Sequence, residues 1–122
     1  MNISTRQSGQ ATILELVGDI TLYSTPDVRK AMIALLKEKR VPWLLVNLKG
    51  VRYIDSSGVA SLVEGLKVSR DTQAKFGLYG LTKTAREVLE LTRLLRVFEV
   101  FNTEDEALGQ AKPETGKTNG AS

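Results

Sequence analysis

The residues with the clearest chemical potential are Asp55-Ser56-Ser57-Gly58, which combine a carboxylate, two hydroxyl groups and a glycine. An apolar run, Trp43 to Leu48, precedes them, and apolar residues at helical spacing follow them at Val59, Leu62, Val63 and Leu66. This pattern predicts that the four residues join a buried strand to a helix. Because the first amide groups of a helix lack internal partners and attract negative charge, a phosphate on either serine would meet an anion site.

The same residue types are also common in unmodified turns and helix caps, so spacing alone leaves a purely structural role open. Spacing also leaves open which serine would be modified. The sequence contains no His, which excludes a Ser-His-Asp mechanism, and no Cys, which excludes disulfides, thiol chemistry and a thiolate metal site. It contains no Walker A sequence, and Gly77 and Gly80 lack the spacing of a dinucleotide fingerprint. We therefore expect no enzymatic activity, no metal and no cofactor.

Composition points to one soluble globular domain. The 122 residues are 42% hydrophobic and 25% charged, and this balance is typical of such domains. The net charge is only +3, and the basic residues are scattered among acidic ones, which argues against direct nucleic-acid binding. No apolar stretch approaches the ~18 residues of a membrane span, and the first residues lack a signal-peptide core, so we expect a cytoplasmic location.

Hydrophobic periodicity predicts alternating strands and helices. The expected strands are Ile3–Gln7, Ala11–Val17, Trp43–Leu48, Phe76–Leu81 and Val97–Phe101. The expected helices are Asp27–Arg40, Ser57–Ala74, Thr84–Leu95 and Thr103–Leu108. Repeated strand-helix-strand units imply a largely parallel sheet with right-handed crossovers, whose carboxyl edge is the usual place for a site. Asp55 to Gly58 follow a strand and therefore belong to that edge.

Several local details can also be predicted. Ser24 or Thr25 is expected to cap the first helix, and Thr84 to Glu87 match a capping box for the third. The third helix should turn Val88, Leu91 and Leu95 inward. Gly65, inside the second helix, suggests close packing against a neighbouring element. Residues 109–122 lack apolar periodicity and are expected to form a disordered tail.

The residues from Val46 to Leu62, with Tyr53-Ile54-Asp55-Ser56-Ser57-Gly58-Val59 at their centre, resemble the STAS domain. Within that family the chain looks most similar to bacterial anti-sigma factor antagonists. Supporting matches are Gly18-Asp19-Ile20, Gly77 to Leu81 and Phe98 to Leu108. The resemblance implies an α/β STAS fold, with a mixed, mostly parallel sheet of four to five strands and about four helices. This single domain would cover residues 1–108.

The resemblance also implies a function and a site. In these antagonists the second serine of the motif, here Ser57, is phosphorylated by a partner anti-sigma factor that is also a serine kinase. The unphosphorylated form binds that partner and releases the sigma factor, and a serine phosphatase reverses the modification. By the same carry-over Asp55 would orient the loop or the kinase, Gly58 would let the partner approach, and Asp19 would lie near the loop. Ser56 remains the rival acceptor.

One stretch departs from the family pattern. Residues Ile20 to Pro26 differ from the residues that commonly follow the aspartate there, which leaves the identity of the partner open. The alternative function is that of a non-catalytic STAS subunit in a stress-signalling scaffold or a lipid-transport complex. In either case we expect a monomer that forms complexes with its partners.

Overall fold

A single sheet of five strands, in the order β1-β2-β3-β4-β5, forms the centre of the computed structural model, which describes residues 1–109. β1 and β2 pair antiparallel, and the other neighbours pair parallel. The strands are β1 (Asn2–Ser8), β2 (Ala11–Val17), β3 (Trp43–Gly50), β4 (Lys75–Tyr79) and β5 (Glu99–Phe101). The predicted mixed, mostly parallel sheet is thus confirmed.

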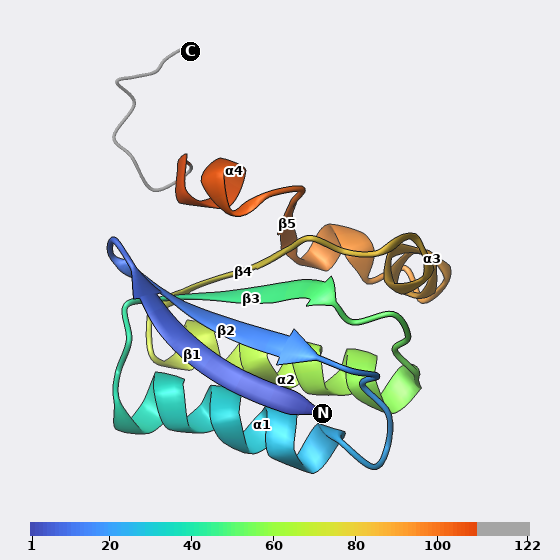
Figure 1. Ribbon diagram of the computed structural model, residues 1–122. Coiled ribbons are helices and arrows are strands. Elements are labelled where there is room, and N and C mark those ends of the chain that lie inside the picture. The colour runs from blue at the N-terminus through green and yellow to red at the C-terminus, as the bar shows by residue number, and fades with distance from the viewer. Residues whose placement is uncertain (110–122) are drawn as a thin grey trace.

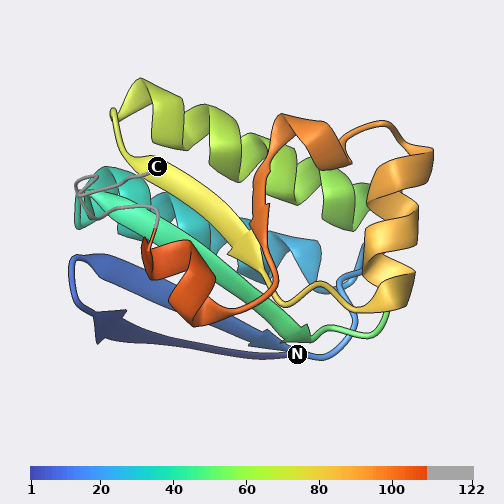
Figure 2. The same cartoon turned by 90° about the horizontal axis from the view of Figure 1, so that it is seen from above.

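Helices cover the two faces of the sheet unequally. α1 (Thr25–Ile33) continues as a π-helix, η1 (Ala34–Glu38), and lies with α2 (Ser56–Asp71) on one face. The short helix α4 (Glu104–Gly109) lies on the opposite face, and α3 (Lys83–Leu91) lies beyond the end of the sheet (Figures 1 and 2). A 3₁₀ turn, η2 (Leu95–Val97), leads into β5. The predicted tail lies outside the described residues, apart from Gly109, which ends α4.

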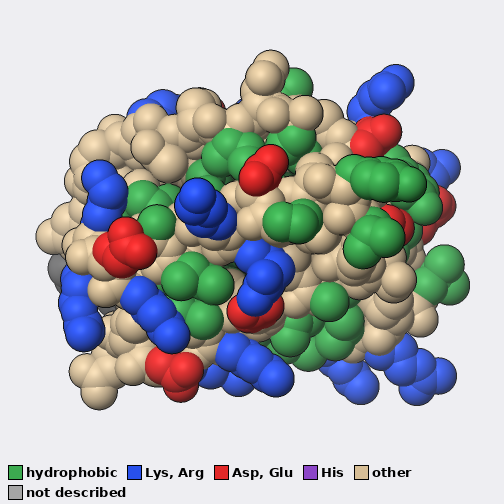
Figure 3. All heavy atoms as spheres, turned by 90° about the horizontal axis from the view of Figure 1, so that it is seen from below, with side chains coloured by type: hydrophobic (Ala, Val, Ile, Leu, Met, Phe, Trp, Pro, Cys, Tyr) green, Lys and Arg blue, Asp and Glu red, His purple; other side chains and the backbone are tan. Residues whose placement is uncertain are grey.

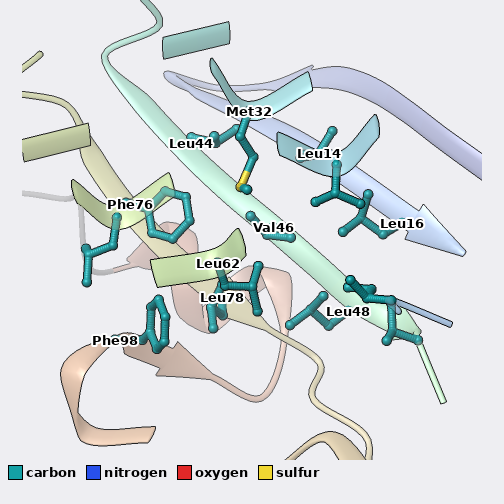
Figure 4. Packing of buried hydrophobic residues seen from close by; sticks show 14 of the residues in the cluster. Leu14, Leu16, Met32, Leu44, Val46, Leu48, Leu62, Phe76, Leu78 and Phe98 are labelled. Carbon is teal, nitrogen blue, oxygen red and sulfur yellow. The ribbon is translucent and has the colours of Figure 1, made fainter. Parts of the chain in front are cut away.

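β3 is apolar on both faces because helices cover both sides of it. Leu44, Val46 and Leu48 belong to the main core under α1 and α2, whereas Trp43 and Leu45 belong to a second cluster beside α4. Figure 4 shows residues of the main core coming from β2, β3, β4 and both helices. Each fully buried leucine contributes about 2 kcal/mol of transfer free energy, so Leu44 and Leu48 stabilise the packing of β3 against the helices.

α1 and α2 approach each other closely at Gly65, as the sequence predicts. A Cβ atom at this position would lie 2.6 Å from Met32 Sδ and 3.2 Å from Phe76 Cζ. Glycine therefore replaces a better helix former because the neighbouring side chains occupy the space.

Ser24 occupies the N-cap position of α1, as predicted, but its side chain does not cap the helix. Ser24 precedes the helix, but its Oγ accepts from Thr21 N–H (3.0 Å) and donates to the Asp19 carbonyl (2.9 Å) instead of bonding to helix amides. Thr25 is the first residue of the helix itself. The side chain of Ser24 thus stabilises the loop after β2, which competes for the same hydroxyl.

The predicted boundaries of α3 are also wrong. Thr82 caps the helix by accepting from Ala85 N–H at 3.3 Å, two residues before the predicted capping box at Thr84. The helix ends at Leu91, whose side chain is 84% exposed, and Leu89 occupies the inward position instead. Arg93 adopts a left-handed conformation (φ 62°), which stops the helix before the predicted end at Leu95.

None of the helices within residues 1–109 is both long enough and apolar enough to span a membrane.

Candidate functional site

The site lies where β2 and β3 end, at the edge of the sheet where their arrowheads point in Figure 1. Ile20, after β2, forms an isolated parallel bridge with Ile54, after β3. Its N–H donates to the Tyr53 carbonyl (2.9 Å), and its own carbonyl accepts from Asp55 N–H (3.0 Å). This additional parallel bridge holds the loop of Asp19 beside the loop of Asp55.

Asp55 is the N-cap of α2 and organises the site. Its Oδ1 accepts from Gly58 N–H (2.9 Å) and from Ser57 Oγ (2.6 Å), and its Oδ2 accepts from Leu22 N–H (3.1 Å). The backbone of Asp55 is extended, so the helix begins at Ser56, one residue earlier than predicted. One carboxylate thus caps the helix, orients the Ser57 hydroxyl and ties down the loop after β2.

The charge of Asp55 is stabilised by these contacts. The hydrogen bond from Ser57 lowers the pKa of the Asp55 carboxyl below its ordinary value, and the amides of Gly58 and Leu22 act in the same direction. Partial desolvation opposes them without reversing the shift. Asp55 is therefore an anion at neutral pH, and Ser57 donates its proton into a charged hydrogen bond.

The two serines differ in exposure. Ser56 is exposed, whereas Ser57 is half-buried, so neither hydroxyl is sealed inside the protein. Among residues 1–109, the described hydrogen bonds include one from the side chain of Ser57 and none from that of Ser56. The structure thus distinguishes two hydroxyls that spacing could not rank.

Gly58 allows close packing inside the protein. It is buried, and a Cβ there would lie 2.6 Å from both the Ile20 carbonyl oxygen and Ile54 Cγ1. The loop after β2 already fills the space that this glycine leaves, and a role of Gly58 in the approach of a partner stays a prediction. Asp19 is exposed near the site, but within the described chain no hydrogen bond joins its carboxylate to either serine.

Exposed apolar side chains surround the site, and sequence reasoning missed them. Leu22, Tyr23 and Tyr53 are 66%, 92% and 47% exposed, and all three belong to the two loops that Ile20 joins. Leu22-Tyr23 between polar residues was the available signal, since large apolar residues in a loop often mark a binding surface. Residues 1–109 contain no group of acidic side chains arranged to hold a metal ion.

These features agree with the comparisons with known proteins. Residues 2–107 match the STAS domain family, and the chain therefore belongs to that family. The anti-sigma-B factor antagonist of Listeria monocytogenes is 33% identical over 95 residues, which cover 77% of this chain and 82% of the relative.

Solved structures share the fold. An anti-sigma factor antagonist from Mycobacterium paratuberculosis has a TM-score of 0.81 at 21% identity, over 89% of this chain and 92% of that one. The Bacillus cell fate determinant SpoIIAA in its phosphorylated form has a TM-score of 0.70 at 17% identity, over 91% of this chain and all of that one (100%). At these identities the structural likeness concerns the fold.

Proposed function

We propose that this protein is an anti-sigma factor antagonist, and that phosphorylation of Ser57 switches off its binding to an anti-sigma factor. The observation that carries the proposal is the 2.6 Å hydrogen bond from Ser57 Oγ to Asp55 at the start of α2. The name of the Listeria relative supports the partner class. The existence of SpoIIAA in a phosphorylated form supports the idea that this fold accommodates the modification.

Ser57 is the better candidate because its hydroxyl is oriented. The Asp55 carboxylate holds the proton of Ser57, so the oxygen lone pairs face away from that carboxylate. A partner kinase would transfer the γ-phosphoryl group of bound ATP to this oxygen, the bond between the γ-phosphorus and ADP would break, and ADP and the hydroxyl proton would be released. Ser56, which is exposed and unconstrained by such a bond, would have to be ordered first.

Phosphorylation would replace an attractive contact with a repulsive one. The ester oxygen has no proton to donate to Asp55, and the phosphate adds about −1.5 to −2 charges beside an existing anion. Asp55 would keep its hydrogen bonds from Gly58 and Leu22, so the helix cap would survive. The helix N-terminus offsets only about half an elementary charge, so the surface becomes strongly negative.

The partner would dock on the exposed apolar side chains next to this charge. Tyr23 and Tyr53 provide the kind of amphipathic anchors that dominate protein interfaces, and Leu22 adds exposed apolar surface beside them. A buried phosphate there would cost desolvation energy unless the partner neutralised it. A coupling of ~1–3 kcal/mol would reduce affinity by roughly 5–150-fold, and a serine phosphatase would restore it. We expect this cycle to occur in the cytoplasm, with the protein itself acting only as a binding module.

The test is phosphorylation by a purified anti-sigma factor kinase with Mg-ATP, followed by peptide mass spectrometry. We expect one phosphoryl group on Ser57, none in Ser57→Ala, and normal incorporation in the matched control Ser56→Ala. Ser57→Glu should weaken binding to the anti-sigma factor within the range above. Phosphate on Ser56 would contradict the assignment of Ser57 as the phosphorylated residue. A pull-down from a lysate that captures a scaffold or transporter subunit and no kinase would favour the alternative function.

A further inference from the structure

A line of residues on α2 faces outward and begins at the proposed switch. Ser56, Ala60, Val63, Lys67 and Arg70 recur at helical spacing, and all are exposed except Val63, which is half-buried. They extend about 21 Å along the helix axis. The opposite side of α2 packs into the main core, so this line is the part of the helix that remains available to a partner.

Two hollows lie between this line and the segment that follows α3. The first, of about 490 Å³, is lined by Ala60, Val63, Glu64, Lys67 and Leu94. The second, of about 260 Å³, is lined by Leu66, Ser69, Arg70, Ala74, Lys75, Phe76, Val97 and Glu99. We refer to the outward line of α2 together with residues 93–97 as the α2–η2 seam. Leu94 and Val97 supply exposed or half-buried apolar surface from the second wall.

The seam carries an excess of positive charge. Lys67 and Arg70 lie on the α2 wall, and Arg93 and Arg96 lie on the other wall, beside a third hollow of about 320 Å³. All four are exposed, and none forms an ion pair within the described part of the chain.

The acidic residues that line the three hollows beside the seam do not balance these cations. Both carboxylate oxygens of Glu64 already bind the Arg29 guanidinium, at 2.6 and 2.7 Å. The other acidic residues that line the hollows are Glu90 and Glu99, which are fewer than the four cations. In the space-filling view from below, hydrophobic patches lie among Lys and Arg side chains on the helical face of the molecule (Figure 3).

We propose that the α2–η2 seam binds an acidic amphipathic segment of the anti-sigma factor. Apolar side chains of that segment would enter the two hollows, and its carboxylates would contact Lys67, Arg70, Arg93 and Arg96. This inference rests on the proposed function, because it takes the same anti-sigma factor as the partner. Ser56 and Ala60 connect the seam directly to the switch. Since the far end of the seam is about 21 Å from the switch, it would contribute affinity whether or not Ser57 is modified.

The test is binding of a purified anti-sigma factor from the same genome, measured by calorimetry at several salt concentrations. In Lys67→Glu/Arg70→Glu we expect affinity to fall at least about tenfold, with a shallower dependence on salt. The control Lys30→Glu/Lys39→Glu makes the same change in net charge on α1 and just after η1, outside the seam, and should bind as the wild type does. If the first variant lacks a cooperative unfolding transition, Arg93→Glu/Arg96→Glu provides the same test.

The outcomes separate this inference from the proposed function. If the wild type binds the anti-sigma factor and both seam variants bind equally well, the seam proposal is wrong and the proposed function stands. If neither the wild type nor Ser57→Ala binds it, the proposed function is wrong, and the seam proposal fails with it. Seam-dependent binding to phosphatidylserine vesicles, with anti-sigma binding unchanged in the variants, would assign the seam to a lipid surface and overturn the proposal.

Discussion

Two carboxylates in this protein each accept hydrogen bonds from three residues, yet they do different things. Asp55 accepts from a serine hydroxyl and two backbone amides at the start of α2. Glu104, at the start of α4, accepts from Arg6, from Ser8 Oγ (3.1 Å) and from Tyr79 Oη (3.0 Å). We refer to Arg6, Ser8, Tyr79 and Glu104 as the α4 anchor.

The α4 anchor holds a helix over the second apolar cluster. Ala107 of α4 is fully buried against that cluster, whose members are Ala11, Ile13, Trp43, Leu45 and Tyr79. The Arg6 guanidinium lowers the pKa of Glu104 to about 2, with help from Tyr79 and Ser8. Burial, followed by the bond to Glu104, raises the pKa of Tyr79 above its ordinary value.

The difference lies in the donors. Those of Asp55 are neutral, and one of them is a half-exposed hydroxyl that a phosphate can replace. Those of Glu104 include a guanidinium that keeps its charge at all accessible pH values. A carboxylate with a replaceable donor suits a switch, whereas a carboxylate paired with arginine and tyrosine suits an anchor.

Gly58→Ala should produce the largest effect, because it tests whether the switch depends on contacts beyond its own helix. Alanine favours helix by up to ~1 kcal/mol, so a purely local site would be stabilised. The new Cβ would instead lie 2.6 Å from the Ile20 carbonyl oxygen, and we expect a net loss of about 2 kcal/mol in unfolding free energy. Urea denaturation measures it. Gly65→Ala is the control, and it should lower the unfolding free energy less because the flexible Met32 side chain can move. Equal stability of Gly58→Ala and the wild type would contradict the close contact between Gly58 and Ile20.

Glu104→Gln should cause the second-largest loss of stability. It removes the charge that holds Arg6 and weakens the bond from buried Tyr79, at a cost of about 1–2 kcal/mol. Asp105→Asn removes the same charge one residue later, where the side chain is exposed, and should cost less. Amide hydrogen exchange should increase in α4 of Glu104→Gln and stay unchanged in α2. Unchanged protection of α4 would mean that packing of Ala107 alone holds the helix.

Acid should remove from the wild type the stabilisation that the ionised Glu104 carboxylate provides. The ordinary pKa of Glu104 is 4.5 and its folded value is about 2, so the folded state binds fewer protons between these values. The stabilisation is complete above about pH 4.5 and declines as the pH falls toward 2. The thermal midpoints of the wild type and Glu104→Gln should therefore converge over that interval. A constant difference between them would argue against the anchor.

Asp55→Asn should have the smallest effect on stability, less than about 1 kcal/mol, because asparagine caps helices as well as aspartate does. The same chemical change thus costs more at the anchor than at the switch. Thermal unfolding at neutral pH compares the two variants, with Asp55→Ala as the control that removes the cap. A larger loss in Asp55→Asn than in Glu104→Gln would reverse the comparison.

The sequence predicted much of the fold because its signals were local. The apolar run of β3 and the helical spacing after Gly58 located the loop correctly, and Gly65 correctly indicated a close helix contact. The errors concern choices among nearby residues. The Ser24 hydroxyl bonds to the Asp19 carbonyl instead of to helix amides. Thr82, whose hydroxyl also donates to the Val51 carbonyl, caps α3 in place of Thr84, and the left-handed Arg93 follows the early end of that helix at Leu91.

By itself, the sequence determined that a carboxylate, two hydroxyls and a glycine stand between a buried strand and an amphipathic helix, because partners two or three residues apart follow from helix geometry. Only the tertiary structure decided that the Leu22 amide also bonds to the Asp55 carboxylate and that Ile20 fills the space beside Gly58. It alone paired Arg6 with Glu104, 98 residues later. Such partners have no fixed spacing along the chain, and they meet only when the sheet brings strand ends and edges together.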